Sequence, residues 1–384
     1  MKKKLLAVAV AGALAAPGLA LAQSSVTISG IFKVSLDNQR IGSSARLAGL
    51  NASETRIADD SSRIIFNVVE DLGGGLQAIA QLDWRVAFDQ GADNIGGNNH
   101  VGLRSKSLGR IFVGRQDLHY FNRESNLTDL AGSLKADSIS LLAYAGGGGT
   151  AIAAASRTPN VIHYTSPDWG GFTVVAAYST SPNPAGAVAG VGAAGSVTES
   201  DIGSAVRRGS AFNLNPNFAA ANWQVGYSYW NQKNDGGGGT FATGDQRSDR
   251  LYGSFKIAGF KIGLAWDKSR IKAATVASSA ELSNRTAWSL PISYIMGNNQ
   301  FHFHYTKARD DKATVAQDGA KMVALSYQYT LSKRTSVGVT YAKITNDVGA
   351  NYNFFTTASL GSASGVAIAG EDPRMIAGTI RHAF

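Results

Sequence analysis

The sequence predicts an all-β fold, a sixteen-stranded antiparallel β-barrel that spans a membrane. Three observations lead to this prediction. Residues alternate between apolar and polar in steps of two, short and long connections alternate along the chain, and no long apolar stretch follows the first twenty-two residues. Period-two alternation indicates strands with one apolar and one polar face. In a large barrel in lipid, the apolar faces point outward and the polar faces line the lumen.

The alternation is clearest in segment 76–89, where Leu82 and Trp84 belong to the apolar row and Asp83 and Arg85 to the polar row. The same pattern recurs in segments 223–230 and 301–306. Many such segments run to ten residues or more, the length needed to cross a membrane at a tilt. A soluble sandwich is the alternative, but its strands would average five to six residues.

The connections between these segments fall into two sizes. The tight ones are 70–76, 106–110, 167–172, 216–222, 257–261, 296–300 and 331–335; the long ones include 41–60, 118–158, 181–204, 234–247, 273–283 and 346–372. Seven hairpins join fourteen strands, and the first and last strands bring the number to sixteen. We expect short periplasmic turns and long extracellular loops. Pro291 lies inside a strand-like segment and suggests a local bulge.

Residues 1–22 read as a secretory signal peptide that is removed. They contain three lysines, an apolar run and the small-residue site Ala20-Leu21-Ala22. A membrane-anchoring helix is the weaker alternative, because Pro17 interrupts a barely sufficient apolar run. Removal of the three lysines lowers the net charge from +9 to +6. Residues 23–384 have a uniform texture without a linker, which predicts a single barrel domain, and the absence of cysteine means that it forms without disulfides.

The final segment, 378–384, has strand-like alternation and ends on Phe384. An open sheet edge in hydrocarbon leaves backbone groups without hydrogen bonds. We therefore expect this strand to pair with the first one, in segment 26–36, and Ile376, Ile380 and Phe384 to face lipid.

Several segments together resemble the general trimeric porins of Gram-negative outer membranes, in the form common among beta-proteobacteria. These are segments 24–32, 61–82, 109–116 and 160–172, and the ending RHAF. The resemblance implies an outer-membrane homotrimer and a water-filled pore, narrowed by a third long loop that folds inward after the fifth strand. It also implies contact with outer-membrane lipid and lipopolysaccharide, and recognition of Phe384 by the barrel-assembly machinery.

Charged side chains in a narrow passage bias which ions enter, because field lines focus there. The resemblance assigns Arg63, Arg115 and Arg157 to the barrel wall at the constriction. The polar row of the third strand adds Arg85, and the alternation of the first strand adds Lys33. The alternative is that these are ordinary lumen-facing charges away from the narrow point.

Arg115 conflicts with strict alternation, which places it on the same face as Ile111 and Val113. Either a bulge intervenes, or this strand has an unusual lining.

The third loop, from Asp117 onward, is expected to face these arginines. Porins of this type often carry a short acidic tip there, whereas this sequence offers Asp117, Glu124 and Asp129, together with the basic Arg123 and His119. The basic wall and the net charge predict a modest preference for anions that salt should weaken.

Other classes of function lack support in the sequence. Gly146–Gly149 and Gly236–Gly239 are not phosphate-binding loops, because no Lys-Ser/Thr follows them. His302 and His304 share a face, but no third metal ligand is evident. We expect no cofactor, no nucleic-acid partner and no enzymatic activity. The leading hypothesis is passive diffusion of ions and small hydrophilic solutes; the alternatives are a channel selective for anions or organic acids, and a structural or adhesive barrel.

Overall fold

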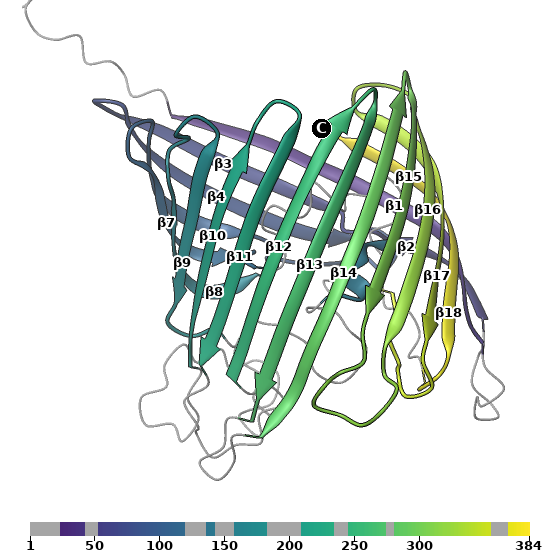
Figure 1. The fold of residues 1–384 in the computed structure, drawn as a ribbon. Helices are drawn as coiled ribbons and strands as arrows, with labels where there is room; N and C mark the ends of the chain where they lie inside the picture. Colours follow the sequence, from purple (N-terminus) through teal and green to yellow (C-terminus); the bar gives the residue numbers. More distant parts are fainter. Residues whose placement is uncertain are drawn as a thin grey trace, which may run out of the picture.

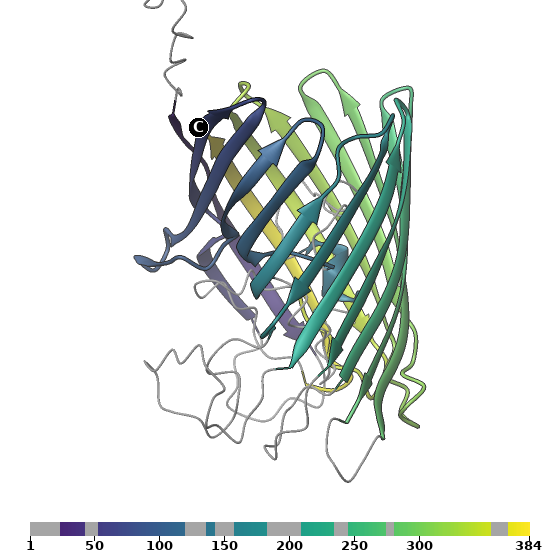
Figure 2. The same ribbon diagram turned by 90° about the vertical axis from the view of Figure 1, so that its left-hand side faces the viewer.

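A computed structural model describes residues 24–42, 53–119, 136–142, 157–182, 209–233, 245–273, 280–354 and 368–384. The expected signal peptide and both glycine runs lie outside the described residues. The described strands form a single antiparallel sheet that closes on itself (Figures 1 and 2). The described residues contain no helix that is long and apolar enough to cross a membrane.

The strands tilt in the same direction around the wall (Figure 1). Their bounds are β1 Ser25–Gly42, β2 Ser53–Asp59, β3 Arg63–Gly73, β4 Leu76–Ala87, β5 Ala92–Asn94, β6 Asn99–Ser105, β7 Gly109–Gln116, β8 Thr158–Thr165, β9 Phe172–Ser179, β10 Ser210–Ala219, β11 Trp223–Lys233, β12 Asp245–Ile257, β13 Phe260–Lys272, β14 Glu281–Met296, β15 Asn299–Ala308, β16 Ala320–Thr330, β17 Thr335–Asn346 and β18 Asp372–Ala383.

Eighteen segments make sixteen wall strands, because two wall strands are interrupted. β1 pairs with β3 through residues 25–31 and with β2 through residues 34–40, so β2 and β3 occupy one position in the wall. β4 likewise pairs with β6 through residues 76–81 and with β5 through residues 85–87. The predicted sixteen-stranded antiparallel barrel is confirmed.

The tight turns lie at one end of the barrel, and the strand ends that flank the long connections lie at the other (Figure 1). Glycines with positive φ shape several of the tight turns. In the first, Gly73, Gly74 and Gly75 all have positive φ, a region that other residues rarely enter. The predicted alternation of short and long connections is confirmed.

Side chains alternate between lipid and lumen as the period-two pattern predicts. On β12, Leu251 and Phe255 point outward and are about half exposed, whereas Arg250 and Tyr252 point inward and are buried. A soluble protein would not leave so many apolar side chains open to water around its whole girth. The outward surface is therefore the lipid-contacting surface of the barrel.

The first and last strands seal the barrel as expected. β1 and β18 pair continuously from Ile31 opposite Ala383 to Gly42 opposite Asp372. Ile376 and Ile380 are each about half exposed on the outward face. The paired residues of β1 and β18 therefore leave no open sheet edge in this seam.

Pro291 does not produce the expected bulge. β14 keeps one register with β13 on both sides of Pro291, and Pro291 itself stands opposite His304 of β15. Near Pro291, the pairing of β14 with β13 is interrupted between Ala265 and Ile262 of β13. Because proline has no N–H, the wall loses hydrogen bonds here without inserting a residue.

Candidate functional site: a basic constriction

The break between β2 and β3 is stabilised by the residues around it. The Asp59 carboxylate accepts hydrogen bonds from the backbone N–H groups of Ser61, at 2.9 Å, and Ser62, at 3.1 Å. The Ser62 hydroxyl replaces a ladder partner, since it donates to the Lys33 carbonyl and accepts from the Lys33 N–H. Ser61 adopts a φ of 74°. This local turn holds the Ser61 side chain near the adjacent strand β4.

The break between β5 and β6 packs against Asp83 of β4. The Gly97 N–H donates to the Asp83 carbonyl at 3.3 Å, and the Asp83 N–H donates to the Asn99 side chain at 2.7 Å. A Cβ atom on Gly97 would lie only 2.0 Å from the Asp83 carboxyl carbon. The segment therefore approaches Asp83 so closely that only glycine fits at position 97.

Arg85 lies between the two breaks. Its Nη2 atom is 2.8 Å from Asp83 Oδ2, and its Nη1 donates to the Ser61 hydroxyl at 2.8 Å. Only 3% of the Arg85 side chain is exposed. Because an Arg–carboxylate contact combines charge with a fixed fork of donors, it fixes the direction of this guanidinium.

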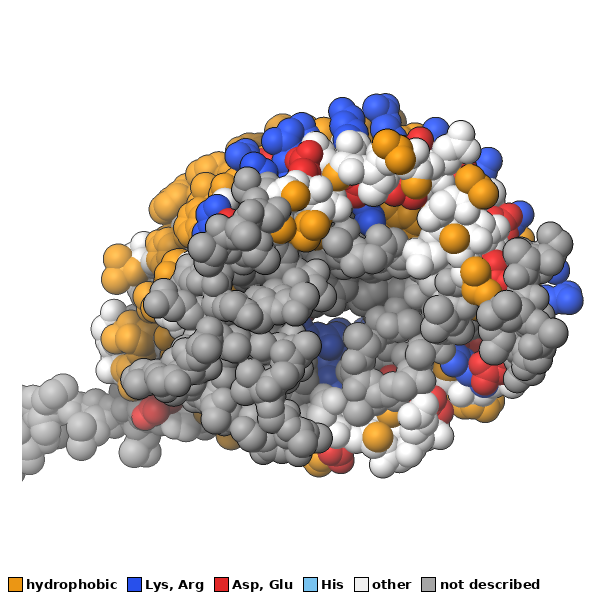
Figure 3. Space-filling view, turned by 90° about the horizontal axis from the view of Figure 1, so that it is seen from below, with side chains coloured by type: hydrophobic (Ala, Val, Ile, Leu, Met, Phe, Trp, Pro, Cys, Tyr) orange, Lys and Arg blue, Asp and Glu red, His pale blue; other side chains and the backbone are white. Residues whose placement is uncertain are grey.

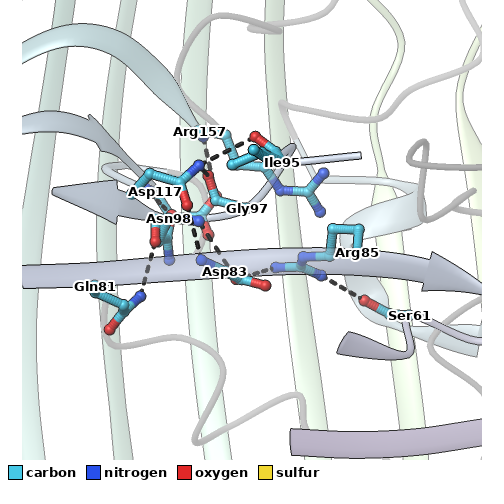
Figure 4. Close-up of polar contacts among 10 residues, drawn as sticks. Ser61, Gln81, Asp83, Arg85, Ile95, Gly97, Asn98, Asp117 and Arg157 are labelled. Atoms are coloured by element: carbon cyan, nitrogen blue, oxygen red, sulfur yellow. Dashed lines mark hydrogen bonds and ion pairs between the residues drawn. The ribbon is translucent and has the colours of Figure 1, made fainter. Parts of the chain in front are cut away.

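The contacts continue from Asp83 to the third loop, as Figure 4 shows. Asp83 Oδ2 also accepts from the Asn98 N–H, the Asn98 side-chain oxygen accepts from the Asp117 N–H, and Asp117 Oδ1 accepts from the Arg157 N–H. One hydrogen-bonded chain thus fixes both ends of the third loop, at Asp117 and Arg157, to the wall strand β4.

Three arginines gather at this point. Arg63 stands directly opposite Arg85 on β3, so both occupy the lumen row. Arg157 lies on the same side of the barrel, and its side chain points toward Arg85 (Figure 4). The Nε atoms of Arg63 and Arg157 are buried and have no hydrogen-bond partner within the described part of the chain. The structure thus brings together three of the arginines that the sequence suggests.

Lys33 lies beside this group but is neutralised. Its Nζ is 3.3 Å from Asp60 Oδ2, and the Asp60 side chain is fully buried in the break after β2. Lys33 therefore contributes to holding the break, and adds less charge to the lumen than the sequence pattern suggests.

Arg115 lies on β7 opposite Asn99 of β6. The register of β7 with β8 shifts between Gly114 and Gln116, and Asn160 in β8 has a φ of 54°. Of the two explanations that the sequence allowed for the position of Arg115, the structure shows the bulge.

The third loop enters the lumen after β7 and is anchored on the far wall. The Arg250 guanidinium of β12 donates to the His119 carbonyl at 2.8 Å and contacts Asp267 of β13 at 2.7 Å. His119 Nδ1 is 2.9 Å from the Ser228 hydroxyl of β11. His119, at the start of the third loop, is thus buried against this wall as an anchor and does not line the pore. We call Ser228, His119, Arg250 and Asp267 the loop clasp.

Further along, residues 136–142 of the same loop pack against the opposite side of the barrel. This stretch includes a short 3₁₀ turn, η2, at Ser138–Ser140. Ala136, Leu141 and Leu142 form one apolar cluster with inward-facing side chains of β14 to β18, among them Ala324, Ala342 and Met375. The small side chains leave room for the loop. The loop folds inward, as expected.

The remaining candidates, Arg123, Glu124 and Asp129, lie outside the described residues. Asp83 was not singled out from the sequence, although its place two positions before Arg85 in the polar row could have revealed it. Among the described residues, no three or more His, Asp or Glu side chains are grouped closely enough to hold a metal ion.

From the long-loop end, an opening leads into the barrel and Lys or Arg side chains are visible inside it (Figure 3). A closed barrel with an apolar exterior, a polar lumen and an inward loop is a membrane channel of the porin class.

The chain belongs to the Gram-negative porin family, whose sequence profile matches residues 7–350. It is similar to an outer membrane porin protein of Bordetella pertussis, with 26% identity over 88% of this chain and 92% of that protein. It is also similar to outer membrane porin protein 32 of Delftia acidovorans, with 32% identity over 47% of this chain and 50% of that one. The protein is thus an outer-membrane channel for ions and small hydrophilic solutes.

Solved structures with the same fold include an anion-selective porin from Comamonas acidovorans, with a TM-score of 0.74 and 20% identity over 94% of this chain and all of that one. OmpT of Vibrio cholerae, in its trimer form, has a TM-score of 0.62 and 12% identity over 94% of this chain and 99% of that one. The family is one of channels rather than enzymes.

Proposed function

We propose that this porin prefers anions, and that Arg63, Arg85 and Arg157 create the preference at the constriction. The observation that carries this proposal is the grouping of three guanidinium groups around two engaged carboxylates. Asp83 is in contact with Arg85, and Asp117 accepts the Arg157 backbone N–H. Among these five residues the three arginines exceed the two acids, and Arg63 and Arg85 stand in the lumen row. A fixed positive field in a narrow passage lowers the entry barrier for anions.

Arg115 and the third-loop residues Arg123, Glu124 and Asp129 complete the proposed lining. Glu124 and Asp129 would reduce the excess charge and Arg123 would increase it, so the preference is expected to be modest. The anion-selective Comamonas porin has the same fold, which is compatible with this proposal.

The test is the reversal potential of the purified protein in a planar bilayer under a salt gradient. We expect a potential on the anion side that shrinks as salt screens the field. Arg63→Glu should move it toward cations, whereas Arg334→Glu, the same charge change in a tight turn, should leave it in place. An unchanged potential in Arg63→Glu would contradict the role of this cluster. A current that saturates with an organic acid would indicate a solute-binding channel instead.

We also infer that the protein forms a homotrimer. We expect residues 1–22 to be removed during export, and Phe384 to assist insertion into the outer membrane. Outward apolar side chains such as Phe88, Val101 and Val113 on the wall from β4 to β7 are about half exposed and offer a protein-binding surface. The trimer form of OmpT has the same fold. Cross-linking should yield trimers, and N-terminal sequencing of the mature protein should begin at Gln23.

A further inference from the structure

A small polar pocket lies at the tight-turn end of the barrel, on the wall formed by β10 to β13. It is lined by the turn at residues 219–223 and by the side chains of Gln224, Ser254, Lys256 and Lys261, and its volume is about 240 Å³. Pockets that hold drug-sized molecules measure roughly 300–1,000 Å³, so this one has room for a small solute only. We call it the mouth pocket.

The four side chains of the mouth pocket belong to lumen rows. Gln224 and Lys261 each follow an aromatic residue that faces lipid and is about half exposed. Ser254 and Lys256 continue the inward row of Tyr252 on β12. Because successive residues of a strand point to opposite faces, all four side chains point inward. The pocket is therefore within reach of solutes that pass through the pore.

Positive charge is concentrated in the mouth pocket. Lys256 of β12 stands directly opposite Lys261 of β13. Like charges at directly opposite positions of an antiparallel sheet repel and destabilise the pair, so an anion that contacts both ammonium groups is favourable. Among the residues that the structure describes, no Asp or Glu lines this pocket. The chemistry of the lining therefore favours an anionic ligand.

Two neutral donors lie beside the lysines. The Gln224 Nε2 atom is buried and has no acceptor among the described residues. The Ser254 hydroxyl stands directly opposite Gln224 on the paired strand. Because buried polar groups nearly always have a hydrogen-bond partner, an unpaired amide donor at the edge of a pocket indicates a position for a ligand oxygen. The Gln224 amide is thus a second observation, independent of the lysines, that points to an oxyanion.

We propose that the mouth pocket binds a phosphate group, either as the free ion or as the monoester of a small alcohol. Neighbouring side chains on paired strands lie about 5 Å apart, so both ammonium groups can contact one phosphate. The amide and hydroxyl groups then donate to its remaining oxygens. Lysine binds phosphate as a point charge, whereas the planar fork of arginine matches a flat carboxylate. The pocket offers lysines and no arginine.

This inference goes beyond the ion preference proposed above and does not depend on it. Arg63 and Arg85 lie on β3 and β4, and Arg157 precedes β8, whereas the mouth pocket lies on β10 to β13. A phosphate that has passed the constriction meets the pocket at the tight-turn end before it leaves the pore. The pocket is thus a second anion site, formed by other strands.

The first experiment measures the binding of inorganic phosphate to the detergent-solubilised protein by phosphorus NMR. It compares the wild type with Lys256→Gln combined with Lys261→Gln. The matched control, Lys333→Gln with Arg334→Gln, removes the same charge from another tight turn at the same end. Because a hydrogen bond to a charged group contributes on the order of tenfold in affinity, the double variant should bind on the order of 100-fold more weakly. The control should match the wild type, and wild-type affinity in the double variant would overturn the proposal.

Lysine acetylation, measured by mass spectrometry, locates the bound phosphate. Inorganic phosphate should slow the acetylation of Lys256 and Lys261 and leave that of Lys106 and Lys333, in other tight turns, unchanged. Equal slowing at all four lysines would show a general effect of the anion and would overturn the site. Binding that is lost in Arg63→Glu and kept in the double variant would place the phosphate at the constriction instead, and would also overturn it.

Competition experiments separate the two sources of the phosphate group. Displacement of inorganic phosphate by glycerol phosphate at equal concentration would identify a site that accepts monoesters. Displacement by inorganic phosphate alone would identify a site for the free ion, and either result supports the phosphate group as the ligand. Succinate carries a similar charge on flat carboxylates and should displace phosphate poorly. Equal displacement by succinate would contradict the proposal.

Channel conductance checks that each variant folds. If the double variant forms no channels, Lys256→Gln alone tests the same prediction, because this side chain is exposed and its loss should weaken phosphate binding about tenfold. The reversal potential in a potassium chloride gradient reports on the constriction, and it should be the same in the double variant and its control. The anion preference and the mouth pocket can therefore fail separately.

Discussion

Phe384 and Gly30 close the barrel through backbone and side chain together. Each donates its N–H to the carbonyl of the other at 3.1 Å. A Cβ atom on Gly30 would lie 2.6 Å from the Phe384 ring and 2.5 Å from the Arg63 carbonyl. The ring also packs against Phe32, with centroids 4.8 Å apart. Glycine at position 30 is therefore what lets the aromatic ring lie over the seam.

Gly30→Ala should destabilise the seam. The added methyl group collides with backbone on one side and a ring on the other, and overpacking of this kind typically costs about 1–3 kcal/mol. We expect the variant to lose its heat resistance on gel electrophoresis at a lower temperature than the wild type.

Gly378→Ala provides the matched control for this change. Gly378 lies in the same seam, opposite Leu36, and nothing lies within 4 Å of the added Cβ. Gly378→Ala should lose its heat resistance at the same temperature as the wild type. Equal melting of all three proteins would show that the contact between Gly30 and Phe384 does not limit stability.

Asp83→Asn should strengthen the anion preference. The change removes a negative charge beside Arg85 while an amide oxygen can still accept one of its hydrogen bonds. Two charges about 6 Å apart in water interact by about 0.7 kcal/mol, so the anion-to-cation permeability ratio should rise about threefold. The reversal potential at low salt measures this ratio. Glu70→Gln, on an exposed part of β3, should not change it, and a shift toward cations in Asp83→Asn would contradict the assigned role.

Arg250→Met should release the third loop from the far wall. The change leaves Asp267 buried without its guanidinium partner, and removing one member of a buried pair typically costs about 3–5 kcal/mol. We expect a lower melting temperature and noisier single-channel currents, because His119 loses the donor to its carbonyl.

Combining Arg250→Met with Asp267→Leu should recover much of the stability, since no buried charge is left behind. The current noise should persist, because the hydrogen bond to His119 is still missing. Recovery of quiet currents in the double variant would show that the clasp does not hold the loop.

The connection between β15 and β16 should loosen in acid because of Asp311. Burial alone would raise the pKa of this carboxyl. Hydrogen bonds from the Ser283 hydroxyl and the backbone N–H groups of Asn284 and Ala313, with the charge of Arg285, outweigh burial and hold the pKa below its ordinary value. The stabilisation is therefore complete above the unfolded pKa of about 3.9, and it is lost as pH falls through the lower folded pKa.

Limited proteolysis of segment 309–319 measures this effect. The wild type should resist cleavage at pH 5 and lose resistance as pH falls below about 3.9 and through the lower folded pKa. Asp311→Asn should be cleaved faster than the wild type even at pH 7, because hydrogen bonds to a charged group contribute about 1.5–3 kcal/mol. Identical cleavage rates at pH 7 would rule out Asp311 as the anchor of this connection.

The sequence predicts the barrel well because the lipid and lumen faces impose opposite polarity on neighbouring residues. Leu82 and Asp83 differ in environment for this reason alone, and their alternation reveals the strand. Glycines in tight turns, such as Gly73, mark where strands end. The strand number follows from these two signals.

The breaks in the wall and the loop clasp could not be predicted from the alternation of apolar and polar residues. The break after Asp59 depends on Ser62 replacing a ladder partner of Lys33, a contact across 29 positions of the chain. The loop clasp depends on Arg250 meeting His119, 131 positions apart. Period-two patterns describe one strand at a time, so they place Arg63 and Arg85 on the lumen face without showing that Asp83 restrains one of them.

The seam between β1 and β18 also has a consequence for the order in which the protein folds. Gly30 and Phe384 are joined only through the whole intervening chain, whereas β17 and β16 meet through a four-residue turn. The entropy lost on closing a loop grows with its length, and contacts between distant residues form slowly. We expect hairpins to assemble first and the seam to form last. Until then both edges of a nearly finished sheet remain exposed, and the rate of folding depends on how fast these two strands find each other.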